Sequence, residues 1–216
     1  MPKLCATGEA IGRDKVFEIL GDHDMLVKPK RKYQRTTYSN HSYAVAPNRI
    51  KGTTPTAPNQ IFVSDITYIQ TLEGVMYLFL VTDLYSRKIV GYDLRRNLMH
   101  YGAIRALTMA LVGVPNPTGI IHHSDRGCQY CCHEFLALLS EYGMVPSMTD
   151  ESHCYQNAVA ERVNGILKLE FYLDAAFHSC SQARYAVQEA IGTYNTIRTH
   201  WSLNLKTPQE VYALAA

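Results

Sequence analysis

The chain has 216 residues, of which 47% are hydrophobic and 19% are charged, and its formal net charge is +2. This length allows one sizeable domain or two small ones. The hydrophobic fraction is typical of a globular protein with a core and excludes an intrinsically disordered chain. No apolar run approaches the roughly 18 residues of a membrane span. The N-terminus is too polar for a signal peptide, so we expect a cytoplasmic protein with no membrane partner.

Positive charge is concentrated at the N-terminus, where residues 1–51 hold ten Lys and Arg against five Asp and Glu. The densest stretch has few apolar neighbours and contains Lys28, Lys30, Arg31, Lys32 and Arg35. Such a segment can neutralise DNA phosphates, although a solvated linker has the same composition. One amphipathic helix, predicted over 12–27, cannot form a core of its own. Residues 1–51 are therefore interpreted as the remnant of a small domain plus a linker.

A folded body is predicted from residue 52 onward, after a proline-containing boundary at 53–58. Hydrophobic periodicity predicts three strands in an antiparallel meander, at 61–69, 75–83 and 88–94. It then predicts a helix at 101–112, a strand at 119–123, a helix at 133–142, a strand at 145–148, and helices at 157–171 and 181–198. A last helix begins at Thr207-Pro208, where Glu210 completes a capping box. This order predicts an α/β fold with a mixed sheet flanked by helices.

A group of metal-ligand residue types lies at Cys128, Cys131, Cys132 and His133, with His122 and His123 nearby. A structural zinc site usually needs a second ligand pair at matching spacing, and the remaining cysteines do not provide one. Small buried or loop residues are therefore the favoured interpretation, with zinc as the alternative.

Three carboxylates have positions that suit chemistry. Asp65 lies in the middle of a predicted strand, Asp125 follows a buried strand, and Glu161 lies on a predicted helix. Each one alone could have a structural role. Together they offer three oxygen ligands without a Cys or His signature, which suits Mg²⁺ or Mn²⁺. Two divalent cations would relieve the repulsion among three carboxylates and support phosphoryl transfer.

The sequence around these carboxylates resembles that of retroviral-integrase-like DDE transposases, the class in which two Asp and one Glu form the catalytic triad. The spacing agrees, with 35 residues between Asp125 and Glu161. Five ordered motifs carry the resemblance more specifically: Phe-Val-Ser-Asp-Ile-Thr-Tyr at 62–68, Asp-Leu-Tyr-Ser-Arg-Lys-Ile-Val-Gly at 83–91, His-Ser-Asp-Arg-Gly-Cys-Gln-Tyr at 123–130, Asn-Ala-Val-Ala-Glu-Arg-Val-Asn-Gly-Ile-Leu-Lys at 157–168, and Tyr-Asn-Thr-Ile-Arg-Thr-His at 194–200 followed by Thr207-Pro208. The match is strongest to bacterial insertion-sequence transposases encoded by the second of two overlapping frames.

The resemblance implies an RNase H-like core at 52–216 that cuts and joins DNA at the terminal inverted repeats of a mobile element. It implies that Asp65, Asp125 and Glu161 hold two Mg²⁺ or Mn²⁺ ions. By analogy, Lys168 would contact DNA near the scissile phosphate, and Arg126 and Gln129 could touch DNA from the loop after Asp125. The implied partners are element-end DNA, target DNA, further copies of the chain, and a companion helix-turn-helix protein from the first frame.

Several alternatives remain at this point. Family members normally begin with more helix-turn-helix sequence, of which only the helix at 12–27 is expected here. A truncated, inactive regulator that binds DNA is therefore one rival, and an RNase H-fold nuclease that only hydrolyses is another. Outside the triad, Asp83 is expected to cap the turn before Ser86-Arg87. His122 and His123 are expected to pack or form hydrogen bonds near the site.

Overall fold

The computed structural model describes residues 12–23, 25–26, 43–150 and 157–214. The chain divides into two units, residues 1–34 and 35–216, which are described separately. In the first unit, helix α2 covers Arg13–Asp22, so it ends five residues before the predicted boundary. The five cations predicted to bind DNA at 28–35 lie outside the described residues. No helix in the described part of the chain is long and apolar enough to cross a membrane.

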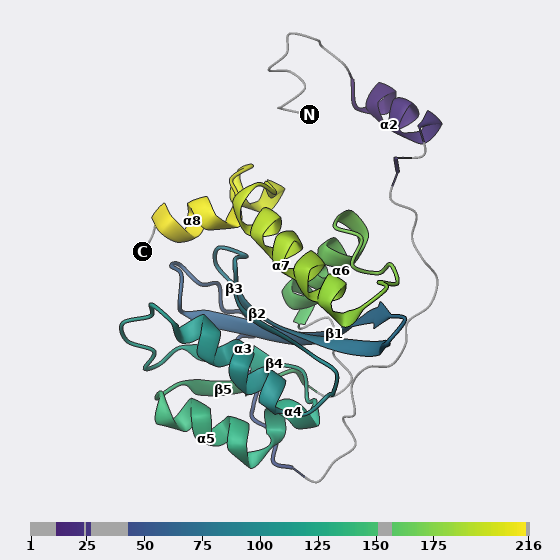
Figure 1. Ribbon diagram of the computed structural model, residues 1–216. Coiled ribbons are helices and arrows are strands. Elements are labelled where there is room, and N and C mark those ends of the chain that lie inside the picture. Colours follow the sequence, from purple (N-terminus) through teal and green to yellow (C-terminus); the bar gives the residue numbers. More distant parts are fainter. Residues whose placement is uncertain (1–11, 24, 27–42, 151–156, 215–216) are drawn as a thin grey trace. The chain divides into compact units, whose positions relative to one another are not determined.

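The second unit is built on one five-stranded sheet with the order β3-β2-β1-β4-β5 (Figure 1). The strands are β1 (Ile61–Thr71), β2 (Gly74–Asp83), β3 (Ile89–Arg95), β4 (Ile121–Ser124) and β5 (Val145–Met148). The first three form an antiparallel meander, because short turns connect them. Strands β4 and β5 lie parallel to β1 and to each other. The predicted mixed sheet is confirmed.

Helices cover both faces of this sheet (Figure 1). One layer contains α3 (Tyr101–Leu111), α4 (Cys128–Cys131) and α5 (His133–Glu141), and the other contains α6 (Ala158–Glu170) and α7 (Cys180–Thr196). Consecutive residues of β2 face opposite layers: Phe79 packs with Leu107 and Phe135, while Leu78 packs with Ile166. Two buried apolar clusters therefore hold the sheet between its helices.

The C-terminal elements are a single 3-10 turn, η2 (Trp201–Leu203), and helix α8 (Pro208–Leu214). The capping box predicted for α8 is confirmed. The Thr207 N–H donates to the Glu210 carboxylate at 2.7 Å, and the Glu210 N–H donates to Thr207 Oγ1 at 3.2 Å. The short elements α4 and η2 were not predicted, because four and three residues are too few to show a helical period.

Asp83 is a structural carboxylate, as predicted. Its Oδ2 accepts hydrogen bonds from the Ser86 N–H at 2.8 Å and the Ser86 hydroxyl at 2.6 Å, and its Oδ1 accepts from the Asn59 N–H at 2.8 Å. One carboxylate oxygen is therefore occupied by the turn between β2 and β3, and the other by the segment that precedes β1.

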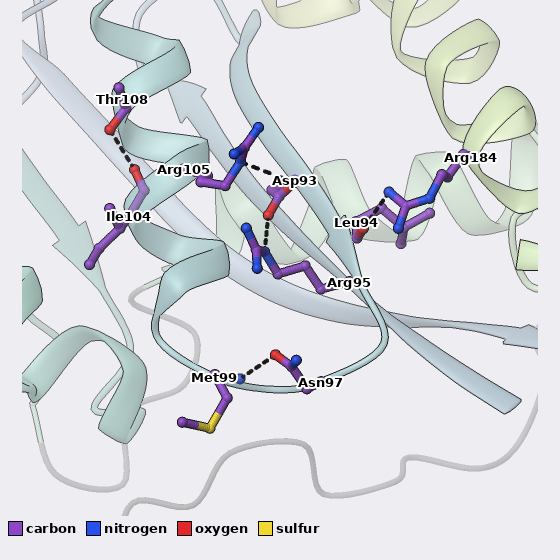
Figure 2. Close-up of polar contacts among 9 residues, drawn as sticks. All are labelled: Asp93, Leu94, Arg95, Asn97, Met99, Ile104, Arg105, Thr108 and Arg184. Carbon is purple, nitrogen blue, oxygen red and sulfur yellow. Dashed lines mark hydrogen bonds and ion pairs between the residues drawn. The ribbon is translucent and has the colours of Figure 1, made fainter. Parts of the chain in front are cut away.

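Strand β3 and helix α3 approach each other closely, and polar side chains at their margin add to this contact. Asp93 on β3 pairs with Arg95 of the same strand and lies 3.9 Å from Arg105 Nε of α3 (Figure 2). At the centre of the contact, a Cβ placed on Gly91 would meet the Ala106 carbonyl oxygen at 2.0 Å and the Ala110 nitrogen at 2.7 Å. The strand can approach the helix only because residue 91 has no side chain.

Gly91→Ala is therefore expected to destabilise the fold by about 1–3 kcal/mol, because backbone atoms on both sides cannot move away from an added methyl group. Gly192→Ala is the matched control, since its new Cβ on α7 meets nothing within 4 Å. That control should stabilise by roughly 0.5–1 kcal/mol through helix propensity. Urea unfolding of both variants measures the difference, and equal stabilities would contradict the packing argument.

Candidate active site

The pairing of β1 with β4 brings the two predicted aspartates together. The strands are parallel, and Val63 lies opposite His123. Two residues further along each chain, the same register places Asp65 of β1 opposite Asp125, which directly follows β4. Asp125 is close enough for its charge to raise the pKa of Asp65, in addition to the larger effect of burial. The structure therefore confirms that these two carboxylates are neighbours.

Helix α6 adds the third carboxylate from the adjacent layer. Asn157 at the start of α6 donates to the Ser64 carbonyl at 2.9 Å, and Asn164 Nδ2 donates to Asp65 Oδ2 at 2.7 Å. Glu161 lies between these two contacts, one helical turn before Asn164. Two asparagines thus fix the helix on β1 at the level at which Glu161 meets the aspartates.

The three carboxylates are partly buried, and the ionisation of Asp65 and Glu161 is suppressed. Burial raises the pKa of Asp65 from 3.8 to about 7, with the charges of Asp125 and Glu161 adding to the effect. Hydrogen bonds from the Ile66 N–H and from Asn164 oppose this rise. Burial also raises the pKa of Glu161, and Asp125 contributes to that shift. Crowded oxygen donors of this kind suit a hard divalent cation, which would remove the repulsion.

The loop after Asp125 is held by hydrogen bonds within itself and to the backbone of neighbouring segments. Asp125 Oδ1 accepts from the Gly127 N–H at 3.0 Å, and Arg126 Nε donates to the Thr149 carbonyl at 2.8 Å. Gln129 in α4 is only 7% exposed, and its amide donates to the Leu98 carbonyl at 2.9 Å. Arg126 is thus partly exposed beside the site, whereas the Gln129 amide points inward to Leu98. The DNA contact of Gln129 stays a prediction.

The two histidines before Asp125 have supporting roles, as expected. The His122 ring lies 2.8 Å from Ser64 Oγ and packs edge-on against Phe135. Burial, with a contribution from His123, lowers the pKa of His122 to about 3, so the ring stays neutral. His123 Nδ1 lies 2.9 Å from Ser147 Oγ on β5. These contacts tie β4 to its neighbours on both sides, directly before the loop that carries Asp125.

Lys168 lies two helical turns beyond Glu161. Its Nζ is 3.9 Å from the centroid of the Tyr68 ring on β1, and the side chain is half-buried. Burial lowers the pKa of Lys168, and the charges of Asp174 and Asp65 oppose that change. The cation is therefore held close to the carboxylates in one orientation, whereas a solvent-facing lysine would be free to move.

Two contributors to the site were missed at the level of individual residues. Asn157 and Asn164 lie within a motif that had been singled out, but only Glu161 and Lys168 of that motif were assigned roles. The spacing could have identified Asn164, because it follows Glu161 by three residues and so lies on the same side of the helix. Which atom of the strand it would meet depends on the packing angle of α6, which the sequence does not give.

Comparison with known proteins agrees with this geometry. The mixed sheet with helices on both faces agrees with the family matches, which place the chain in the integrase-core class of polynucleotidyl transferases. Models described as integrase core domain match residues 55–154 and 142–208. The chain belongs to the insertion-sequence transposases of this class and acts in DNA transposition.

The relatives cover nearly the whole chain. It is 38% identical to an uncharacterized 31 kDa protein of insertion element IS600 from Shigella sonnei, over 95% of the chain and 76% of that protein. It is 33% identical to transposase InsF of IS3A from Escherichia coli, over 96% of the chain and 73% of the relative.

Solved structures of low identity confirm the RNase H-like fold. The catalytic core of HTLV-2 integrase, solved with magnesium, superimposes with a TM-score of 0.59 at 20% identity, covering 74% of this chain and 99% of that one. An integrase in a simian T-cell lymphotropic virus intasome superimposes with a TM-score of 0.62 at 19% identity, covering 97% of this chain and 69% of that one.

Asp65→Asn should stabilise the metal-free protein in a pH-dependent way. Since folding raises the pKa of Asp65 to about 7, the folded chain keeps a proton that the unfolded chain loses between pH 3.8 and 7. The free energy of unfolding of the wild type therefore falls as the pH rises through this window. The free energy of unfolding of the variant does not fall in this way. The difference in stability between the variant and the wild type should therefore grow with pH, to the order of 1 kcal/mol near neutrality.

Urea unfolding in EDTA at several pH values measures this difference, with Glu189→Gln as the control for the loss of an exposed negative charge. A variant whose stability parallels that of the wild type at every pH would show that Asp65 is not under electrostatic stress.

Proposed function

We propose that Asp65, Asp125 and Glu161 are the catalytic triad of this transposase and that they hold two Mg²⁺ or Mn²⁺ ions. The observation that carries the proposal is the convergence of three carboxylates, in which burial and the charge of Asp125 raise the pKa values of Asp65 and Glu161. The chemistry of the donor set fits the ions, since hard oxygen ligands suit Mg²⁺ and Mn²⁺. When bound, two such ions activate the attacking oxygen and stabilise the leaving oxygen of a phosphodiester.

The proposed reaction has two displacement steps at phosphorus. In the first, a water oxygen attacks the phosphodiester at the end of the element, the P–O3′ bond breaks, and a free 3′-OH remains. In the second, this 3′-OH attacks a phosphodiester of the target, and the target strand's own 3′ oxygen leaves. Each step loses a proton from the attacking oxygen and gives one to the leaving oxygen, so both are balanced transfers.

The protein's own groups orient this reaction. Asn164 donates to Asp65 Oδ2, and the Ile66 N–H donates to Oδ1 at 2.9 Å, so the carboxylate is held in one orientation. Lys168, placed over the Tyr68 ring, offers a positive charge for a DNA phosphate near the triad. Arg126 is proposed as a second phosphate contact, from the loop next to Asp125. Element-end DNA and target DNA are the proposed substrates, bound by a multimer of the chain because two ends must be joined together.

The rival functions differ in what they predict. Membership of a transposase family does not favour the truncated, inactive regulator. The convergence of the carboxylates also disfavours it, because a protein that only binds DNA has no use for an electrostatically costly cluster. A nuclease that only hydrolyses would perform the first displacement without the second.

Strand transfer tests the proposal directly. The full chain is incubated with Mn²⁺ or Mg²⁺ and a labelled duplex that ends in a free 3′-OH, beside Asp125→Asn and Glu161→Gln. Joined products should require metal and fall at least about 100-fold in both variants, since each removes a metal ligand. Glu189→Gln, an exposed change of the same kind, should keep full activity. Cutting without joining would identify a nuclease, and unchanged joining in either triad variant would refute the assignment.

Lys168→Ala tests the phosphate contact. The variant should bind element-end DNA more weakly, and the slope of log affinity against log salt should decrease by about one, because one phosphate contact is lost. Lys206→Ala removes an exposed lysine elsewhere and serves as the control. If both variants keep the wild-type slope in fluorescence anisotropy titrations, Lys168 does not contact DNA and serves only to pack against Tyr68.

A further inference from the structure

A second group of metal-ligand side chains lies where α3 and α5 begin. A ring nitrogen of His100, Cys132 Sγ and a Glu134 carboxylate oxygen all lie within 4.8 Å of one another. His100 directly precedes α3, while Cys132 and Glu134 belong to the start of α5. We propose that these three side chains bind one Zn²⁺ ion at a site that shares no residue with the proposed catalytic triad.

The donor set suits zinc and does not suit magnesium. Thiolate sulfur, imidazole nitrogen and carboxylate oxygen are the ligand types of protein zinc sites, whereas magnesium takes oxygen ligands. A thiolate and a carboxylate together neutralise a doubly charged ion, and the neutral imidazole adds no charge. In a tetrahedral zinc site the donor atoms lie roughly 3.3–3.8 Å apart. The observed grouping therefore needs only small rotations of its side chains, and water completes the fourth position.

The two chain segments that supply the ligands are already joined. Gln129 Nε2 donates to the carbonyl of Leu98, two residues before His100, at 2.9 Å. The Cys132 S–H donates to the Gln129 carbonyl at 3.4 Å. The turn ahead of His100 is closed by Asn97, whose Oδ1 accepts from the Met99 N–H (Figure 2). Because one residue connects both segments, the ligands are positioned before an ion arrives, which favours binding.

His100 provides a further observation. Its Nε2 is buried and has no hydrogen-bond partner among the residues that the structure describes. A buried polar atom without a partner is costly and calls for an explanation such as an ion. The ring also interacts with Glu134, whose carboxyl pKa is lowered first by its own backbone N–H and further by His100 and Cys132. The three side chains therefore already interact as one group.

This ligand set differs from the cysteine cluster that the sequence suggested. Cys131 is buried with its sulfur 3.6 Å from that of Met148, and His133 is exposed. Only Cys132 of that cluster belongs to the proposed zinc site. Its partners are His100, over thirty positions earlier in the chain, and Glu134. The ion would join the beginnings of α3 and α5 and so brace the segment that follows the Asp125 loop.

The experiment uses the full chain with Co²⁺ as the spectroscopic probe and Zn²⁺ for stoichiometry and stability. Co²⁺ bound to a thiolate gives a charge-transfer absorption that the all-oxygen triad cannot produce. We expect one Zn²⁺ per chain and a thiolate band in the wild type and in Cys128→Ser, the control for a neighbouring cysteine. Cys132→Ser should lose the band, and His100→Gln and Glu134→Gln should weaken Zn²⁺ binding by at least about 100-fold.

Thermal unfolding separates lost binding from lost folding. In EDTA, the variants should unfold close to the wild type. Added Zn²⁺ should raise the unfolding temperature of the wild type and Cys128→Ser by more than that of the three ligand variants, in which only the carboxylate triad remains to bind it. A band that persists in Cys132→Ser would place the ion on another cysteine and overturn the proposal. Wild-type protein that takes up no thiolate-bound ion would overturn it as well, leaving a hydrogen-bonded cluster only.

Discussion

The parallel pairing of β1 with β4 is the constraint on which the site depends. A parallel neighbour cannot be reached by a tight turn, so the chain must cross over through α3 before it returns beside β1. That crossover places residues sixty positions apart, Asp65 and Asp125, opposite each other in one register. The antiparallel meander β1-β2-β3 gives β1 a second neighbour, so the strand that carries Asp65 is central and rigid. Helix α6 then needs to supply only one more carboxylate.

Bringing these carboxylates together has an electrostatic cost that the surroundings limit without removing it. Asn164 and the Ile66 N–H donate to Asp65 and lower its pKa, but burial and the neighbouring charges outweigh them. His122, directly behind the site, offers no compensating charge, because burial keeps its ring neutral. The site is thus left with an excess of negative potential. That excess is what a divalent cation needs, and it explains why the fold tolerates a stressed cluster at its centre.

Much of this architecture could be predicted from the sequence, because it is written in local patterns. Alternation identified the meander, and the capping box at Thr207 identified the start of α8. The motifs around Asp65, Asp125 and Glu161 identified residues that the structure then brings together. The contacts that the sequence did not predict depend on packing. Nothing in the sequence shows that Gln129 turns inward to Leu98, or that Asn164 reaches Asp65. Those contacts depend on helix packing angles, and α4 has only four residues, too few to show a helical period in the sequence.

The same contacts show how the stability and the chemistry of the site are linked. If Asp65 holds a metal ion, as proposed, that ion must displace the proton that burial keeps on the carboxylate, so ion binding and proton release are one equilibrium. Under this proposal, protons relieve the repulsion at Asp65 below a pH of about 7, and cations relieve it above that pH. A triad that ionised freely would bind its ions at lower pH but would repel DNA phosphates whenever it was empty. Partial burial therefore lets the site approach DNA with less charge and acquire its full charge only together with the ions that neutralise it.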